Sequence, residues 1–227
     1  MRKKLAGFIH TTPATIGMVE RFMHICAQDI EIVHIHNGLM KRDNFASPVG
    51  VTPESNIERY ESYAQELYAA GCDIIVSCCS LMRRATANAA RKVKIPFIQL
   101  DAVVLDAAAD GYERIGVINT TEYVVPYIVE HINERAQVLG RKPEVIFSNN
   151  TGVLGLFNAG DFDNHDRIVL EDIEKLEAKS VDCVLMGQIP FGLMEEKIKA
   201  ARFSVPVLLA GEYAFRHVAG VLARKSR

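Results

Sequence analysis

Residues 7–12 read Gly-Phe-Ile-His-Thr-Thr, and residues 116–121, which follow 109 positions later, read Gly-Val-Ile-Asn-Thr-Thr. Each stretch is a short apolar run, typical of a buried strand, and ends in small polar side chains. Two further pairs lie at nearly the same offset: residues 73–79 with 182–188, and residues 95–98 with 205–208. A shared offset at three strand ends indicates two similar halves within one chain.

Between these strands the sequence alternates short apolar runs with longer amphipathic stretches. Strands are predicted at residues 5–9, 30–35, 74–77, 97–100, 115–118, 144–147, 183–186 and 205–209, and helices at 17–27, 54–70, about 80–93, 124–139 and 168–179. This alternation predicts an α/β fold with a parallel sheet in each half. We expect residues 1–100 to form the first half and 101–206 the second, with 207–227 returning to the first. Residues 149–161, rich in Asn and Gly, are expected to form one long loop.

The composition excludes several classes of protein. The chain has 227 residues, 49% of them hydrophobic and 24% charged, with a net charge of −2. Such a balance lacks the basic excess of a nucleic-acid-binding protein, and we find no apolar run long enough to span a membrane. Five cysteines, an odd number, do not suggest a disulfide framework. No glycine-rich phosphate loop is present, which disfavours a nucleotide cofactor. We therefore expect a cytoplasmic globular protein with reduced thiols.

Small polar side chains gather at the predicted strand ends of both halves. In open parallel sheets, ligands bind beyond the carboxyl ends of the strands. If the two halves face each other, these side chains converge on one cleft, where hydroxyl and amide groups suit a carboxylate. The expected substrate-binding residues are Thr11, Thr12, Cys78, Ser80, Asn119, Thr120, Thr121 and Gln188.

At these strand ends the sequence resembles the aspartate/glutamate racemase superfamily, which includes hydantoin racemase, maleate isomerase and arylmalonate decarboxylase. Its first motif, similar to Asp-x-x-x-x-Ala-Cys-Asn-Thr, is represented by residues 73–80, and its second, Gly-Cys-Thr followed shortly by Pro, by residues 184–190. The resemblance implies two pseudo-symmetric, flavodoxin-like half-domains with parallel sheets and an active-site cleft between them. It also implies a small carboxylate substrate, a homodimer, and neither metal nor organic cofactor such as pyridoxal phosphate.

In this superfamily, two thiols flank the α-carbon of the substrate, and lowered thiol pKa values favour proton abstraction. The spacing from Asp73 and the internal repeat both favour Cys79 as the first thiol, with Cys78 as the alternative. Gln188 stands in the place of the second thiol. A glutamine amide does not shuttle protons near neutral pH, so single-thiol isomerisation, decarboxylation, or racemisation with another base is favoured. A catalytically inactive member that binds a carboxylate metabolite is the alternative, and a Cys–His hydrolase is a third hypothesis.

Two further residues are candidates for the same site. His10 ends the first predicted strand, where it would form a thiolate–imidazolium pair with Cys79 or act as the missing second base; the alternative is a histidine that only hydrogen-bonds its loop. Arg42, after the second strand, would contact a substrate carboxylate. Residues 161–166, Asp-Phe-Asp-Asn-His-Asp, are interpreted as a solvated loop or helix cap rather than a calcium loop, because the required Gly and distant Glu are absent.

Overall fold

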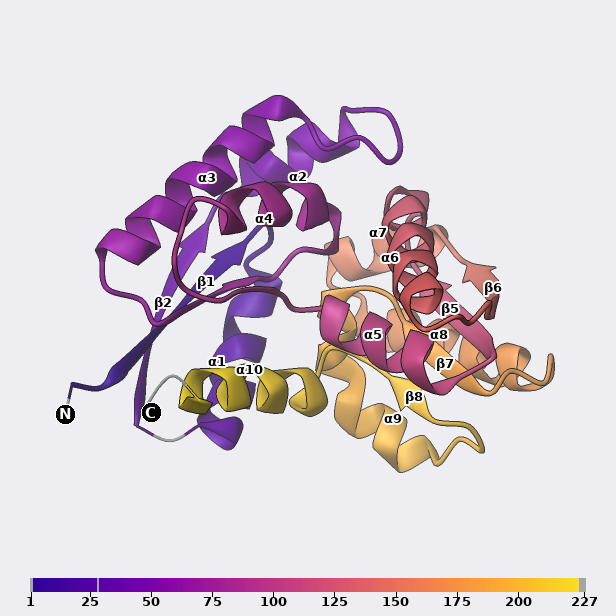
Figure 1. The fold of residues 1–227 in the computed structure, drawn as a ribbon. Coiled ribbons are helices and arrows are strands. Elements are labelled where there is room, and N and C mark those ends of the chain that lie inside the picture. The colour runs from indigo at the N-terminus through magenta and orange to yellow at the C-terminus, as the bar shows by residue number, and fades with distance from the viewer. Residues whose placement is uncertain (1, 28, 225–227) are drawn as a thin grey trace.

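The computed structural model describes residues 2–27 and 29–224 and contains two four-stranded parallel sheets (Figure 1). The first sheet has the order β2-β1-β3-β4 and the second the order β6-β5-β7-β8. The strands are β1 (Lys4–His10), β2 (Ile30–His36), β3 (Ile74–Ser77), β4 (Phe97–Gln99), β5 (Arg114–Asn119), β6 (Glu144–Asn149), β7 (Cys183–Met186) and β8 (Val207–Leu208). The identical order in both sheets confirms the predicted α/β fold of two related halves.

The glycine that opens each repeat allows a helix to lie close to the central strand. A Cβ atom on Gly7 would come within 2.9 Å of the Leu67 side chain on α3 (Glu54–Ala69). A Cβ atom on Gly116 would come within 3.2 Å of Leu176 on α8 (Phe162–Glu177). Both distances are shorter than ordinary carbon contacts, so the two repeats keep glycine for the same packing reason.

The five predicted helices are present, with shifted ends. They are α1 (Ala14–Cys26), α3, α4 (Arg83–Ala90), α6 (Val125–Val138) and α8. The largest shift is at α8, which begins six residues before the predicted start at 168. The Asp161 side chain accepts a hydrogen bond from the Asn164 N–H, so Asp161 is the expected helix cap. Residues 162–166 are not a solvated loop, because they form the start of α8, where His165 and Asp166 are buried.

Five helices were not predicted: α2 (Gly38–Phe45), α5 (Ala102–Gly111), α7 (Gly152–Ala159), α9 (Glu195–Ala201) and α10 (Glu212–Arg224). The prediction of a long loop at residues 149–161 is therefore wrong, because α7 occupies most of this segment. Its Val153 is buried in the core of the second half, and Gly160 ends the helix in the left-handed region at φ +78°. Burial of Val153 and a glycine C-terminus outweigh the loop-like composition of this segment.

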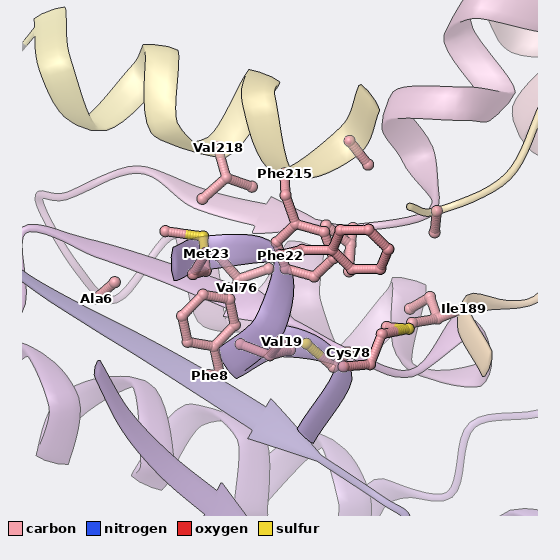
Figure 2. Close-up of a cluster of buried hydrophobic side chains, with 14 of the residues drawn as sticks. Ala6, Phe8, Val19, Phe22, Met23, Val76, Cys78, Ile189, Phe215 and Val218 are labelled. Carbon is pink, nitrogen blue, oxygen red and sulfur yellow. The ribbon is translucent and has the colours of Figure 1, made fainter. Parts of the chain in front are cut away.

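The last helix, α10, packs against α1 beside the first sheet (Figures 1 and 2). Phe215 on α10 stacks on Phe22 of α1, with ring centroids 5.3 Å apart and an interplanar angle of 17°. Val218 joins the same buried cluster. β8, which directly precedes α10, completes the second sheet, so the chain crosses from one half to the other at this point. None of the helices in the described part of the chain combines the length and apolar character of a membrane span.

Candidate active site

A cavity lies where strand ends of the two sheets meet. The centre of a water molecule can move through about 80 Å³ of this cavity. That space suits several waters or a small ligand. Strand-end residues from both halves line it: Thr11, Thr12, Cys78, Cys79, Ser80, Thr120, Thr121 and Gln188. The remaining lining residues are mostly apolar: Phe45, Leu81, Val124, Leu154, Phe157, Pro190 and Phe191, together with Lys41 and His165. The structure thus brings eight of the eleven predicted site residues to one cavity.

The two adjacent cysteines differ in exposure. The Cys78 side chain is 1% exposed and packs in the cluster that contains Phe8 and Ile189 (Figure 2). Its backbone N–H donates to the Ile9 carbonyl at 2.9 Å, which extends the sheet pairing beyond β3. Cys79 is half-buried and precedes the 3₁₀ turn η1 (Ser80–Met82), where the chain leaves the sheet. The geometry therefore favours Cys79 as the thiol that a ligand would meet.

Burial raises the pKa of the Cys79 thiol to about 11. A hydrogen bond with Thr11, another from the Leu81 backbone, and the charge of Lys41 oppose this rise in pKa without cancelling it. Cys79 is therefore a neutral thiol at pH 7 in this structure. This corrects the expectation of a lowered pKa and a resting thiolate: the apolar surroundings disfavour the charged form more than the nearby donors favour it.

Gln188 occupies in the second half the place that Cys79 occupies in the first. It directly precedes the 3₁₀ turn η3 (Ile189–Met194), as Cys79 precedes η1. Its Oε1 accepts hydrogen bonds from the Thr120 N–H at 2.6 Å and from Thr120 Oγ1 at 3.0 Å. Because the carbonyl end is held in this way, the –NH₂ end is the one that can donate to a ligand.

Ser80 links the cavity floor to the second half. Its Oγ accepts a hydrogen bond from the Ile189 N–H at 3.4 Å. It also hydrogen-bonds Asp101, a buried carboxyl whose pKa is raised by burial although Gln99 and Ser80 lower it. The Ser80 hydroxyl thus has two protein partners, and its contact with a ligand would compete with them.

His10 does not line the cavity. Its ring is fully buried, with Nδ1 at 2.7 Å from Thr15 Oγ1 and Nε2 at 2.9 Å from His34 Nδ1. Burial, reinforced by His34 and His36, lowers the pKa of His10 to about 3. His10 is therefore neutral at pH 7, and its ring points toward β2. It neither pairs with the Cys79 thiol nor stands in the cavity as a second base. Alternation along β1 explains this, because His10 shares a face with Phe8.

Arg42 and Asn119 also lie outside the cavity lining. The Arg42 side chain is 72% exposed, and its guanidinium donates to Asp43 Oδ1 at 2.9 and 3.1 Å. Asn119 is buried, and its Nδ2 donates to the Thr121 carbonyl at 2.9 Å. This hydrogen bond stabilises the turn that carries Thr120 and Thr121 to the cavity. Asn119 therefore positions these two residues and does not itself line the cavity.

Two titratable residues of the cavity, Lys41 and His165, were not predicted from the sequence. Lys41 lies on α2, and its Nζ donates to Asn158 Oδ1 of α7 at 3.1 Å, so it joins the two halves beside the cavity. His165 lies in the first turns of α8 and is 4% exposed. The detectable signal is helical spacing: His165 heads a stripe with Val169 and Ile173, both buried, so it points inward.

Comparisons with known proteins agree with this fold. The family model described as Asp/Glu/Hydantoin racemase matches residues 13–218. No curated protein sequence matches the chain significantly. Among solved structures, the *Picrophilus torridus* aspartate racemase has a TM-score of 0.69 at 13% identity and covers 98% of this chain and 94% of its own.

Two further solved structures are similar over most of their length. A *Francisella tularensis* glutamate racemase in complex with D-glutamate has a TM-score of 0.72 at 14% identity, covering 100% of this chain and 83% of its own. An allantoin racemase from *Klebsiella pneumoniae* has a TM-score of 0.69 at 13% identity, covering 98% and 89%. At such identities the likeness shows the fold alone, whereas the family match spans most of the sequence. The chain belongs to the Asp/Glu/Hydantoin racemase family.

Proposed function

We propose that this protein is a racemase-type isomerase that acts at the α-carbon of a small carboxylate, without a cofactor and with Cys79 as its one reactive thiol. The observation that carries the proposal is the position of Cys79: half-buried, at a strand end, in a cavity lined by both halves. Family membership supports the same reaction class.

The donors around the cavity favour an anionic ligand. Lys41 supplies a positive charge, Gln188 an amide –NH₂, and Thr11, Thr12 and Thr121 supply hydroxyl groups. Among the described residues that line the cavity, none is an aspartate or a glutamate. A carboxylate would therefore meet hydrogen-bond donors without a repelling charge. The apolar remainder of the lining suits a substituent without charge on the α-carbon.

These donors also suit the intermediate of the proposed reaction. When a base removes the α-proton, the electron pair of the C–H bond moves onto the carboxylate, which becomes an enediolate. Donors that face the carboxylate oxygens stabilise the added charge. Cys79, a thiol at neutral pH because burial raises its pKa to about 11, then suits the role of acid. Its S–H proton would pass to the α-carbon and restore the C–H bond.

A second candidate is a protein that binds a carboxylate without converting it. The neutral state of Cys79 and the glutamine at position 188 both favour this alternative. The two candidates differ in whether the α-proton of a bound acid exchanges with solvent.

The test is α-proton exchange in D₂O, followed by NMR on separate enantiomers. The panel contains aspartate, glutamate, phenylalanine and phenyllactate. We expect at least one compound to gain deuterium with wild-type protein, and its inversion to fall by about 100-fold or more with Cys79→Ser. Cys26→Ser is the matched control, because Cys26 lies at the end of α1 outside the cavity lining. Binding of a panel acid without exchange would favour the second candidate.

A further inference from the structure

A second titratable group with acid–base chemistry reaches the same cavity from the second half. His165, on α8, lines the cavity together with Cys79, which is contributed by the first half. The two side chains therefore reach the cavity from different halves of the molecule. Inversion at a carbon atom requires one group on each face, and side chains from the two halves can supply them.

The ring of His165 is held in one orientation. Its Nδ1 lies 2.7 Å from Asp166 Oδ1, and the Lys197 Nζ lies 2.5 Å from Asp166 Oδ2. The rings of Phe157 and Phe191 lie beside it, with centroids 5.4 and 6.2 Å away. A carboxylate acceptor at Nδ1 favours the tautomer with the proton on that nitrogen, so Nε2 carries the lone pair available to a ligand.

The charges around His165 are few and come from identified elements. Asp166 belongs to its own helix, and Lys197 reaches in from α9. Lys41 and the Cys79 thiol also line the cavity. Asp166, paired with His165 Nδ1, holds the ring in place while Nε2 accepts and returns a proton.

We infer that His165 is the acid–base partner of Cys79, in place of the thiol that Gln188 replaces in this sequence. The inference rests on the proposed function and assigns the second base of that reaction. From one enantiomer, His165 Nε2 takes the α-proton, and the C–H electron pair moves onto the carboxylate. The Cys79 S–H then gives its proton to the opposite face. One C–H bond breaks and one forms, leaving an imidazolium and a thiolate.

The opposite enantiomer runs the same steps in reverse. The Cys79 thiolate takes the α-proton, and the His165 imidazolium returns its proton from Nε2. Loss of the imidazolium proton to water and uptake of a proton by the thiolate restore the starting forms. A different residue thus removes the α-proton from each enantiomer. Substitution of His165 and substitution of Cys79 should therefore abolish exchange on different enantiomers.

The experiment applies the same panel in D₂O to wild-type protein, Cys79→Ser and His165→Gln. We expect both variants to lose inversion by about 100-fold or more. Cys79→Ser should still exchange the α-proton of one enantiomer with retention, because the imidazolium proton of His165 exchanges with solvent. His165→Gln should lose exchange on that enantiomer. Inversion by His165→Gln within threefold of wild type would overturn the assignment and leave the proposed function standing. Failure of the wild-type protein to exchange any panel compound would overturn both.

A second comparison guards against a folding defect in His165→Gln. Lys197 and Lys199 are both on α9 and equally exposed at 52%, but Lys199 pairs with Glu195, Glu196 and Glu212 instead of Asp166. In Lys197→Met, Asp166 loses its ammonium partner, so the pH dependence of kcat/KM should change for the enantiomer that His165 deprotonates. Lys199→Met should leave that pH dependence unchanged, and identical profiles for the two variants would contradict the assignment.

Discussion

Ser80 and Ile189 meet across the two halves, with the Ile189 N–H donating to Ser80 Oγ at 3.4 Å. They are 109 residues apart, which is the offset of the sequence repeat. Each residue therefore occupies the same position in its own half, and the pseudo-twofold axis passes between them. Cys79 and Gln188 are the residues immediately before them. The site is consequently symmetric in backbone and asymmetric in chemistry.

Removal of the Ser80 hydroxyl should weaken the contact between the halves. In Ser80→Ala, the N–H of the fully buried Ile189 loses its acceptor and Asp101 loses a hydrogen bond. We expect the free energy of unfolding to fall by about 1–2 kcal/mol, measured by urea denaturation. Ser62→Ala is the control, because this serine is exposed on α3, and it should change stability by less than about 0.5 kcal/mol. Equal effects of the two substitutions would show that the contact between the halves contributes nothing.

The thiol of Cys79 should react slowly in the folded protein. Because burial raises its pKa to about 11, the thiolate fraction at pH 8 is about 100-fold smaller than for an ordinary cysteine. Iodoacetamide labelling, resolved between Cys78 and Cys79 by fragmentation in a mass spectrometer, should be slower at pH 8 in the native protein than in urea by at least this factor. The native rate should still rise between pH 9 and 10. Equal native and unfolded rates at pH 8 would contradict the buried-thiol geometry.

Burial of His10 should make the protein sensitive to acid. The unfolded chain binds a proton at His10 near pH 6.5, whereas the folded protein does so only near its lowered pKa of about 3. Stability from this residue is present above pH 6.5 and is lost as the pH falls, by roughly 2–3 kcal/mol at pH 4.5. In His10→Gln, unfolding free energy should therefore fall less steeply between pH 6.5 and 4.5.

The control for His10 is His24→Gln, because His24 is exposed on α1. This variant should keep the wild-type pH dependence of unfolding. A His10→Gln profile parallel to that of wild type would mean that His10 titrates normally in the folded protein.

Gly192 should tolerate no side chain, although it lies outside any left-handed turn. A Cβ atom there would be 2.5 Å from the backbone oxygen of Ala210, which has little freedom to move. Gly192→Ala should destabilise the protein by about 1–3 kcal/mol, measured as a shift in the urea midpoint. Gly17→Ala, on α1 with nothing within 4 Å of the added Cβ, should instead stabilise by about 0.5–1 kcal/mol. A neutral Gly192→Ala would show that η3 can move away from Ala210.

The sequence predicted the location of the cavity more accurately than the identity of the residues that would react with a ligand there. Strand ends of parallel sheets meet at one edge, so eight polar residues at these ends reach the cavity as expected. Side-chain direction at the last strand residue is less predictable. His10 follows the alternation of β1 toward His34, whereas Thr11, one residue later, lines the cavity. The Arg42 prediction failed for a different reason: Lys41 and Phe45 are the residues of α2 that line the cavity, and Arg42 lies on the exposed side of the helix.

The sequence by itself determined the two related halves, their parallel α/β character and the edge at which the site forms, because these follow from hydrophobic period and an internal repeat. Only the tertiary structure decided which chemistry meets there. The neutral state of Cys79 depends on how much water the surrounding residues exclude, and the presence of His165 depends on α8 folding back over the second sheet. Both depend on contacts between residues far apart in the chain: helical spacing predicts that His165 points inward, but not that it meets a cavity there.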